Sequence, residues 1–233
     1  RQKTAATQPF PVGDAFVPQA VTEEDVKNDL SSDFTGEIGG IFTPFWDVPI
    51  TLKPGPTGGA NWPPSAYNPD TEYFYVLGND TYMSFGRSEL GECKERDQYY
   101  GSIYGSILDA PVRGTVTAID VKTNKIAWQQ KWDTQAYSGV LTTKGNLVFV
   151  GHNDGRLIAY DAKTGNQVWE YMMDAGANAP SITYEIDGEQ YISIYAAGNA
   201  LAGSKHGDKI YTFKLGGDLP EGQVIKFPAK STK

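Results

Sequence analysis

The residues that could carry acid–base or metal chemistry are few in this sequence and stand apart. His152 and His206 are too far from each other along the chain to suggest a local ligand pair, and satisfied histidines at the surface are the default expectation. Cys93 is the single cysteine, which excludes an internal disulfide and predicts an unpaired thiol in an irregular loop. The segment "GHNDGR" around His152 lacks the strand-to-helix context of a phosphate loop. None of these three residues is therefore assigned as a catalytic residue or a metal ligand.

Two aspartates occupy equivalent places in the pattern Asp-x-Lys-Thr, in "DVKTN" from Asp120 and "DAKTG" from Asp161. A carboxylate in this position can accept hydrogen bonds from backbone N–H groups of its own turn. Asn124 and Gly165 are then expected to take the left-handed conformation that small or Asx residues accept at low cost. Turn capping is favoured over catalysis for both aspartates.

Amide side chains in loops offer a different chemistry, because an amide can donate hydrogen bonds to a ligand carbonyl oxygen. Asn61 follows two glycines, with Trp62 next to it and the double proline Pro63-Pro64 after it. Asn199 and Ala200 lie in the loop "AAGNALAG". Functional residues concentrate on loops, but a turn residue before two prolines is the competing interpretation of Asn61.

A repeated sequence phrase predicts the strands that would position these residues. "GTVTAIDVKTNKIAWQ" (114–129) returns as "GRLIAYDAKTGNQVWE" (155–170), 41 positions later. Each copy alternates apolar and polar residues, reaches the Asp turn and continues into a second strand that contains Trp128 or Trp169, so each copy is predicted to be a β-hairpin. The 26 glycines, 14 prolines and 14 tyrosines also favour an all-β class of short strands and tight turns.

Further strands are predicted beside the hairpins, in "EYFYVLGND" (72–80), "NLVFVGHND" (146–154) and "QYISIYAAG" (190–198), which are apolar enough to be buried on both faces. Four short antiparallel strands in a unit of about 40 residues, with a recurring Trp, are typical of a β-propeller blade. We predict about three blades, or four if residues 36–60 contribute, as part of a larger ring. Trp128 and Trp169 are expected between neighbouring blades.

Three regions are predicted along the chain: a polar lead segment at 1–35, propeller blades at 36–215 with an inserted loop at about 84–110, and a peripheral tail at 216–233. The lead segment holds one helical candidate, "TEEDVKNDL", with Thr22 as N-cap and Asp25 as the acid of a capping box. The last unit shows no returning Trp strand, and the chain opens without an initiator Met. The sequence is therefore expected to be the C-terminal part of a propeller that has been cut or that assembles from copies.

Charge and hydropathy narrow the class of partners. The net charge of −8 and the pI near 4.8 disfavour a nucleic-acid surface, which needs clustered Lys and Arg. No apolar run approaches the ~20 residues of a membrane span. A protein that binds small molecules fits this composition better.

The motif Ala-x-Asp-x-x-Thr-Gly-x-x-x-Trp, present as "AYDAKTGNQVW" and in the variant "AIDVKTNKIAW", resembles the tryptophan-docking motif of the dehydrogenases that depend on pyrroloquinoline quinone (PQQ). "LKPGPTGGANWPPSAYNPDTEYFYV" and "SITYEIDGEQYISIYAAGN" are similar to two late segments of that family. The resemblance covers residues 41–215 and corresponds to about the last third of a family member. It implies an eight-bladed propeller with PQQ on its axis.

The resemblance also implies site residues. It places Asn61 against the quinone with Trp62 as its neighbour, and it places Asn199 and Ala200 where some members carry a Trp above the cofactor. It implies a calcium or lanthanide ion and a base, all held by residues outside the matched part. The chain is then not expected to be active alone.

Two hypotheses follow. In the first, the chain is part of a quinoprotein dehydrogenase that oxidises alcohols, or related sugars or aldehydes, by hydride transfer to PQQ. This hypothesis implies a periplasmic location, a cytochrome or quinone as electron acceptor, and an upstream propeller segment or further copies to close the ring. The alternative is a non-catalytic propeller scaffold that shares the docking repeats, because such repeats belong to the fold and not to the site.

Overall fold

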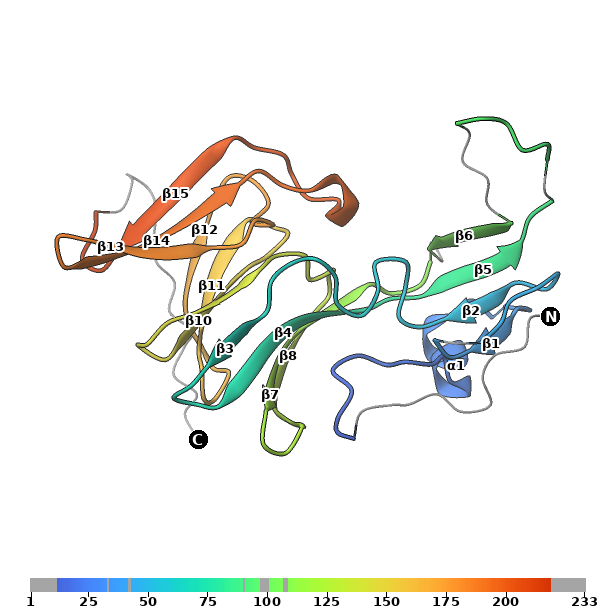
Figure 1. Ribbon diagram of the computed structural model, residues 1–233, viewed down its shortest axis with the longest axis horizontal. Helices are drawn as coiled ribbons and strands as arrows, with labels where there is room; N and C mark the ends of the chain where they lie inside the picture. The colour runs from blue at the N-terminus through green and yellow to red at the C-terminus, as the bar shows by residue number, and fades with distance from the viewer. Residues whose placement is uncertain are drawn as a thin grey trace. The chain divides into compact units, whose positions relative to one another are not determined.

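The computed structural model describes residues 12–32, 34–41, 43–89, 91–96, 101–106 and 109–218. These residues divide into two compact units, the first formed from residues up to Asn61 and Asn79–Arg113, the second from Trp62–Gly78 and from Gly114 onward. Among the described residues the strands form four sheets, three of four strands and one of three (Figure 1). The predicted all-β class with four-stranded antiparallel blades is confirmed.

The second unit contains three of these sheets. The first comprises β3 (Ala66–Asn68), β4 (Tyr73–Asp80), β7 (Arg113–Asp120) and β8 (Lys125–Trp132), in that order, with the far end of β4 and the first residue of β7 belonging to the first unit. The second has the order β12-β11-β10-β9, from β9 (Val140–Thr142), β10 (Leu147–Gly151), β11 (Arg156–Asp161) and β12 (Gln167–Met172). The third comprises β13 (Ile182–Ile186), β14 (Glu189–Ala196) and β15 (Lys209–Lys214). Both predicted hairpins are present, as β7–β8 and β11–β12.

The two Asp turns form as predicted. The Asp120 carboxylate accepts hydrogen bonds from the backbone N–H groups of Lys122 (2.8 Å) and Thr123 (3.1 Å). Asp161 accepts the equivalent bonds from Lys163 (3.1 Å) and Thr164 (2.8 Å). Asn124 and Gly165 have φ values of 55° and 71°, in the left-handed region. Each carboxylate is therefore used by its own turn.

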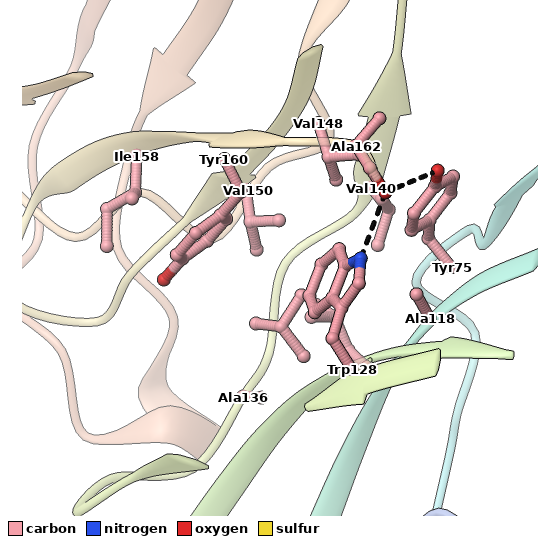
Figure 2. Close-up of a cluster of buried hydrophobic side chains, with 12 residues drawn as sticks. Tyr75, Ala118, Trp128, Ala136, Val140, Val148, Val150, Ile158, Tyr160 and Ala162 are labelled. Carbon is pink, nitrogen blue, oxygen red and sulfur yellow. Dashed lines mark hydrogen bonds between the residues drawn. The ribbon is translucent and has the colours of Figure 1, made fainter. Parts of the chain in front are cut away.

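Trp128 lies between the first two sheets of this unit, as the repeat predicted. It is buried in a cluster with Val116, Val148 and other apolar residues, and its indole N–H donates to the carbonyl oxygen of Ala162 at 2.9 Å. The Tyr75 hydroxyl donates to the same oxygen at 3.0 Å, so that one carbonyl of the second sheet receives two side chains of the first (Figure 2). These contacts join the two sheets through polar as well as apolar groups.

A second cluster joins the other pair of sheets. Phe149, Leu157 and Tyr171 are buried against Ile194 and Ala196 of β14, and Trp169 meets Phe213 of β15 edge to face, with ring centroids 5.4 Å apart. The opposite face of the β13-β14-β15 sheet is open within the part of the chain that the structure describes. Large apolar side chains there are exposed, among them Ile182, Tyr195 and Ile210.

The first unit contains the fourth sheet and the helix. The sheet has the order β1-β2-β5-β6, from β1 (Glu37–Gly39), β2 (Ile50–Leu52), β5 (Met83–Arg87) and β6 (Ser102–Ser106). The β1–β2 pair is parallel and the other pairs are antiparallel. Residues 36–60 thus contribute strands, and the stretch predicted as an inserted loop at about 84–110 includes most of β5 and all of β6. Residues 90, 97–100, 107 and 108 of that stretch lie outside the described part, as do 1–11, 33 and 42, and 219–233 of the tail.

Helix α1 (Glu23–Asp29) begins at the predicted capping box, in which the Thr22 side chain accepts from the Asp25 N–H and the Asp25 carboxylate accepts from the Thr22 N–H. The helix is anchored by buried charges. The Lys53 ammonium, 1% exposed, lies 2.9 Å from carboxylate oxygens of both Asp25 and Asp80. Arg113 donates two hydrogen bonds to Asp29, at 2.7 and 2.8 Å. Each buried charge has an opposite charge beside it, as burial requires.

Candidate functional site at the loop end of the second unit

The loops that carry most of the predicted site residues gather at one end of the sheets of the second unit. Val140, at the start of β9, pairs with Val150, near the end of β10, and Gly151 pairs with Leu157 of β11. Because neighbouring strands are antiparallel, the connections 133–139, 152–155, 173–181 and 197–208 all emerge at this end. The segment before β3 joins them, since the Val140 N–H donates to the Pro64 carbonyl oxygen at 2.9 Å. We call this edge the loop end.

Trp62 lies at the loop end and is 58% exposed as a residue. Its Nε1–H donates to the hydroxyl of Tyr137 at 2.8 Å, and the two rings meet edge to face with centroids 5.9 Å apart. Tyr137 is buried. A buried phenol therefore holds the indole in place while much of the indole surface stays accessible, as a ring that contacts a flat ligand requires.

Asn199 and Ala200 lie on a short turn at the same end. Asn199 caps the 3-10 helix η1 (Ala200–Ala202), its side-chain oxygen accepting from the Leu201 N–H at 2.8 Å. Its own N–H donates to the Ser204 hydroxyl at 2.7 Å. Ala200 is exposed and offers a methyl group. The side-chain oxygen of Asn199 is thus engaged within the turn.

Asn178 connects these features. Its side chain is buried, and its Nδ2 group donates to the Tyr137 carbonyl oxygen at 3.0 Å and to the Asn153 side-chain oxygen at 2.7 Å. The Asn178 side-chain oxygen accepts from the Ser204 hydroxyl at 2.6 Å. A path of hydrogen bonds thus runs from Trp62 through Tyr137, Asn178 and Ser204 to Asn199, with the hydroxyl and the backbone carbonyl of Tyr137 linked by the residue itself.

Tyr137, Asn178 and Ser204 are not among the site residues predicted from the sequence. A signal for two of them was available, because Asn178 stands 41 positions after Tyr137, the same offset that relates the two repeated phrases. The two residues are therefore equivalent positions of successive blades. Ser204 carries no comparable signal.

Asn61 belongs to the first unit and is the last residue of that unit's first segment, directly before Trp62. It is exposed, and its Nδ2 group donates to the Thr57 carbonyl oxygen at 2.6 Å. The structure thus brings Trp62 and the Asn199 turn to one edge of the second unit and describes Asn61 within the first. A role for Asn61 at the cofactor stays a prediction.

His152 corrects an expectation, because it is buried and not at the surface. Its Nδ1 lies 2.8 Å from the Asp154 carboxylate, its Nε2 lies 3.3 Å from the Thr134 hydroxyl, and its ring packs edge to face on Trp132. Burial acts to raise the pKa of Asp154, but hydrogen bonds from His152 and the Arg156 backbone N–H lower that pKa to about 2. His206, by contrast, is exposed.

Within the described ranges, no three His, Cys, Asp or Glu side chains are grouped so that they could hold a metal ion. No helix in that part of the chain has the length and hydropathy of a membrane span. The polar groups of the loop end are instead amides, hydroxyls and an indole. Within this set the exposed Trp62 ring is the group that can pack against a planar ligand such as a quinone, because the Trp62 indole N–H, the Asn178 amide and the Ser204 hydroxyl donate within the protein.

Comparisons with known proteins agree with this picture. The model of the PQQ family (glucose/ethanol/alcohol dehydrogenase, β-propeller domain) matches residues 1–192. The quinoprotein alcohol dehydrogenase PedE of Pseudomonas putida KT2440 is 40% identical over 148 residues, which cover 63% of this chain and 23% of that protein. A quinoprotein ethanol dehydrogenase of P. putida is 36% identical over 194 residues, covering 79% of this chain and 30% of the relative.

Solved structures give the same result. The quinohemoprotein alcohol dehydrogenase ADH-IIG of P. putida HK5 superposes with a TM-score of 0.66 at 31% identity, over 73% of this chain and 28% of the other. The chain spans less than a third of the length of these relatives. With the family model matching most of its residues, this chain belongs to the family of PQQ-dependent glucose, ethanol and alcohol dehydrogenase β-propeller domains.

Proposed function

We propose that this chain is part of a PQQ-dependent dehydrogenase that oxidises alcohols, or related sugars or aldehydes. When bound, PQQ supplies the acceptor for the hydride that leaves the substrate carbon. The observation that carries the proposal is the loop end, where the half-exposed Trp62 indole is fixed by Tyr137 beside the Asn199 turn. The family membership and the names of the relatives, which are alcohol and ethanol dehydrogenases, supply the substrate class.

The role of this chain in the reaction is to bind and orient the cofactor. Trp62 would offer the face of its ring to the planar quinone, and the exposed Asn61 amide would donate to one of its oxygens. Asn199 and Ala200 would border the same ligand from the loop after β14. A calcium or lanthanide ion prefers several hard oxygen ligands. We assign these ligands, the ion and the base to residues outside this chain.

Completion of the ring is the second part of the proposal. The open face of the β13-β14-β15 sheet carries apolar side chains that are 58% (Ile182), 53% (Ile186) and 72% (Ile210) exposed. An apolar area of this kind is expected to be covered in the assembled protein. An upstream propeller segment or further copies of the chain would cover it. A periplasmic location and a cytochrome or quinone as electron acceptor complete the proposal.

A titration with PQQ tests the proposed contacts. Asn61→Ala and Trp62→Leu should each weaken PQQ binding, by roughly tenfold or about 1.4 kcal/mol for one lost contact. Asn166→Ala, an exposed asparagine in the turn after β11 at the other end of the strands, is the matched control and should bind as the wild type does. Wild-type protein that binds no PQQ in the complete ring would contradict the enzyme proposal and favour a non-catalytic propeller scaffold.

A further inference from the structure

Asn178 occupies a position where three loops of the second unit meet. Its Nδ2 group bonds the loop before β9, through the Tyr137 carbonyl oxygen, and the loop after β10, through the Asn153 side chain. Its Oδ1 bonds the loop after β14, through the Ser204 hydroxyl. Asn178 itself stands in the loop between β12 and β13. Four connections therefore share one side chain.

The surroundings of Asn178 leave little room for another arrangement. The side chain is only 4% exposed, and Ser204 is 8% exposed. A Cβ atom added at Gly176 would lie 2.6 Å from both the Asn178 Oδ1 and the Ser204 Cβ, so the backbone approaches this pair closely. The Gly176 N–H also donates to Lys205 O, and the Gly198 N–H donates to Gly176 O. A buried amide that loses its partners here cannot turn to water.

The two ends of the path are the residues assigned to the cofactor. At one end the Tyr137 hydroxyl accepts from the Trp62 indole, and at the other the Ser204 hydroxyl accepts from the Asn199 N–H. Trp62 and Asn199 are 137 positions apart in the sequence. Asn178 is the point at which the two halves of this path meet.

We propose that Asn178 is a positioning residue, which couples the Trp62–Tyr137 pair to the Asn199 turn and thereby holds both in one geometry for cofactor binding. The effect on cofactor binding rests on the proposed function. The coupling between the Trp62–Tyr137 pair and the Asn199 turn does not, because it exists without a ligand. Positioning groups act by removing alternative geometries before the ligand arrives, and their loss weakens binding without a change in the contacting groups. Asn178 needs no contact with the cofactor for this role.

Asn178→Asp is the sharpest variant, because it keeps the shape of the side chain. The new carboxylate can still accept from Ser204, but it presents oxygen to the Tyr137 carbonyl and to the Asn153 side-chain oxygen, which are both acceptors there. Below its pKa the new carboxyl group becomes protonated and can donate one of the lost hydrogen bonds. The defect should therefore be largest at neutral pH and partly relieved in acid. Wild-type protein measured at both pH values accounts for the native charged and titratable groups of the four connections, which are Asp133, Tyr137, His152, Asp154, Asp174, Lys205, His206 and Asp208.

The coupling is measured without ligand, by NMR on the chain. The Trp62 indole signal, assigned by its loss in Trp62→Phe, should shift in Asn178→Asp, and the amide of Asn199 should exchange faster with solvent. Ser204→Ala keeps Asn178, and Ser204 reaches Trp62 along this path only through Asn178 and Tyr137, yet the variant should shift the same indole signal. Asn166→Asp, at the other end of the strands, should change neither. Unchanged Trp62 and Asn199 signals in both test variants would overturn the inference. If Asn178→Asp fails to fold, an unchanged Trp62 signal in Ser204→Ala would overturn it.

The consequence for binding is measured by titration with PQQ. Asn178→Asp should raise the dissociation constant roughly tenfold at neutral pH, which corresponds to about 1.4 kcal/mol, with partial recovery in acid. Wild-type affinity in a variant whose Trp62 signal has shifted would overturn the positioning role and leave the proposed function standing. Wild-type protein that binds no PQQ in the complete ring would overturn the proposed function, while the NMR signals still decide the coupling.

Discussion

The Trp128 indole N–H donates a hydrogen bond of 2.9 Å to the carbonyl oxygen of Ala162, a residue of the neighbouring sheet. The ring of the same tryptophan lies over the turn that follows Ala162, where a Cβ atom at Gly165 would come within 2.5 Å of it. This contact gives a physical reason for the repeat of the sequence phrase. The Trp of one copy packs on the Gly turn of the next copy, so two successive copies form one joint.

Gly165→Ala tests this joint. Gly165 has a φ of 71°, so alanine there is strained, and its methyl group would also collide with the Trp128 ring. We expect a loss of about 2–4 kcal/mol in the free energy of unfolding, which combines left-handed strain with overpacking. Gly188→Ala is the matched control, because its φ is 80° but nothing lies within 4 Å of an added Cβ. Urea unfolding of the two variants should differ clearly, and equal losses would show that Trp128 imposes no packing demand on the turn.

Asp161 tests the turn itself. Its carboxylate accepts from the N–H groups of Lys163 and Thr164, so Asp161→Ala should cost about 1 kcal/mol, as the loss of similar caps does. Asp161→Asn retains an oxygen acceptor at the same place and should lose much less. Thermal unfolding of the two variants measures the difference. Equal stability of Asp161→Ala and the wild type would argue against a capping role.

Much of the fold follows from the sequence because it rests on local signals. Alternation of apolar residues, the Asp turns and the positions of Asn124 and Gly165 predict the hairpins, and the structure confirms them. The capping box of α1 is equally local. β5 and β6, which lie largely within the predicted inserted loop, have few residues of the alternating type and find their partners in β2 and in each other.

The site was less accessible to sequence reasoning. Trp62 and Asn199 could be chosen from motifs, but the residues that hold them act across long sequence separations, such as the 75 positions between Trp62 and Tyr137. The buried position of His152 depends on Trp132 and Thr134 from a different strand and loop. Such contacts are products of the tertiary fold, and no local pattern contains them.

Acid should weaken the first unit through Asp29. Hydrogen bonds from Arg113 and Tyr82 lower the pKa of Asp29 from 3.8 to about 2, against the opposing effect of burial. A carboxyl group with a lowered pKa stabilises the folded state above its ordinary pKa, and that contribution disappears as the pH falls from 3.8 towards 2. Asp29→Asn should reduce the free energy of unfolding by about 2 kcal/mol at neutral pH and should flatten its fall in acid. Urea unfolding at a series of pH values measures this, and an unchanged acid profile would exclude Asp29 as a contributor.

Lys53 should be the most sensitive charged residue of the first unit. Its ammonium is buried between Asp25 and Asp80 and lies 4.1 Å from the centroid of the Tyr82 ring. Lys53→Met keeps the length of the side chain but leaves two carboxylates without their cation, and we expect a loss of about 3–5 kcal/mol. Arg87→Met, in which an exposed pair with Asp47 is lost, is the control and should cost less than about 1 kcal/mol. Similar losses in the two variants would contradict the anchoring role of Lys53.

The central claim is that this chain forms part of a closed propeller that binds PQQ. Native mass spectrometry of the purified protein with PQQ and calcium, beside a denaturing measurement of its polypeptides, tests that claim most directly. We expect an assembly larger than the 25.4 kDa of the single chain, formed with an upstream segment or with further copies, that carries bound PQQ. A lone 25.4 kDa chain without PQQ under these conditions would contradict the account.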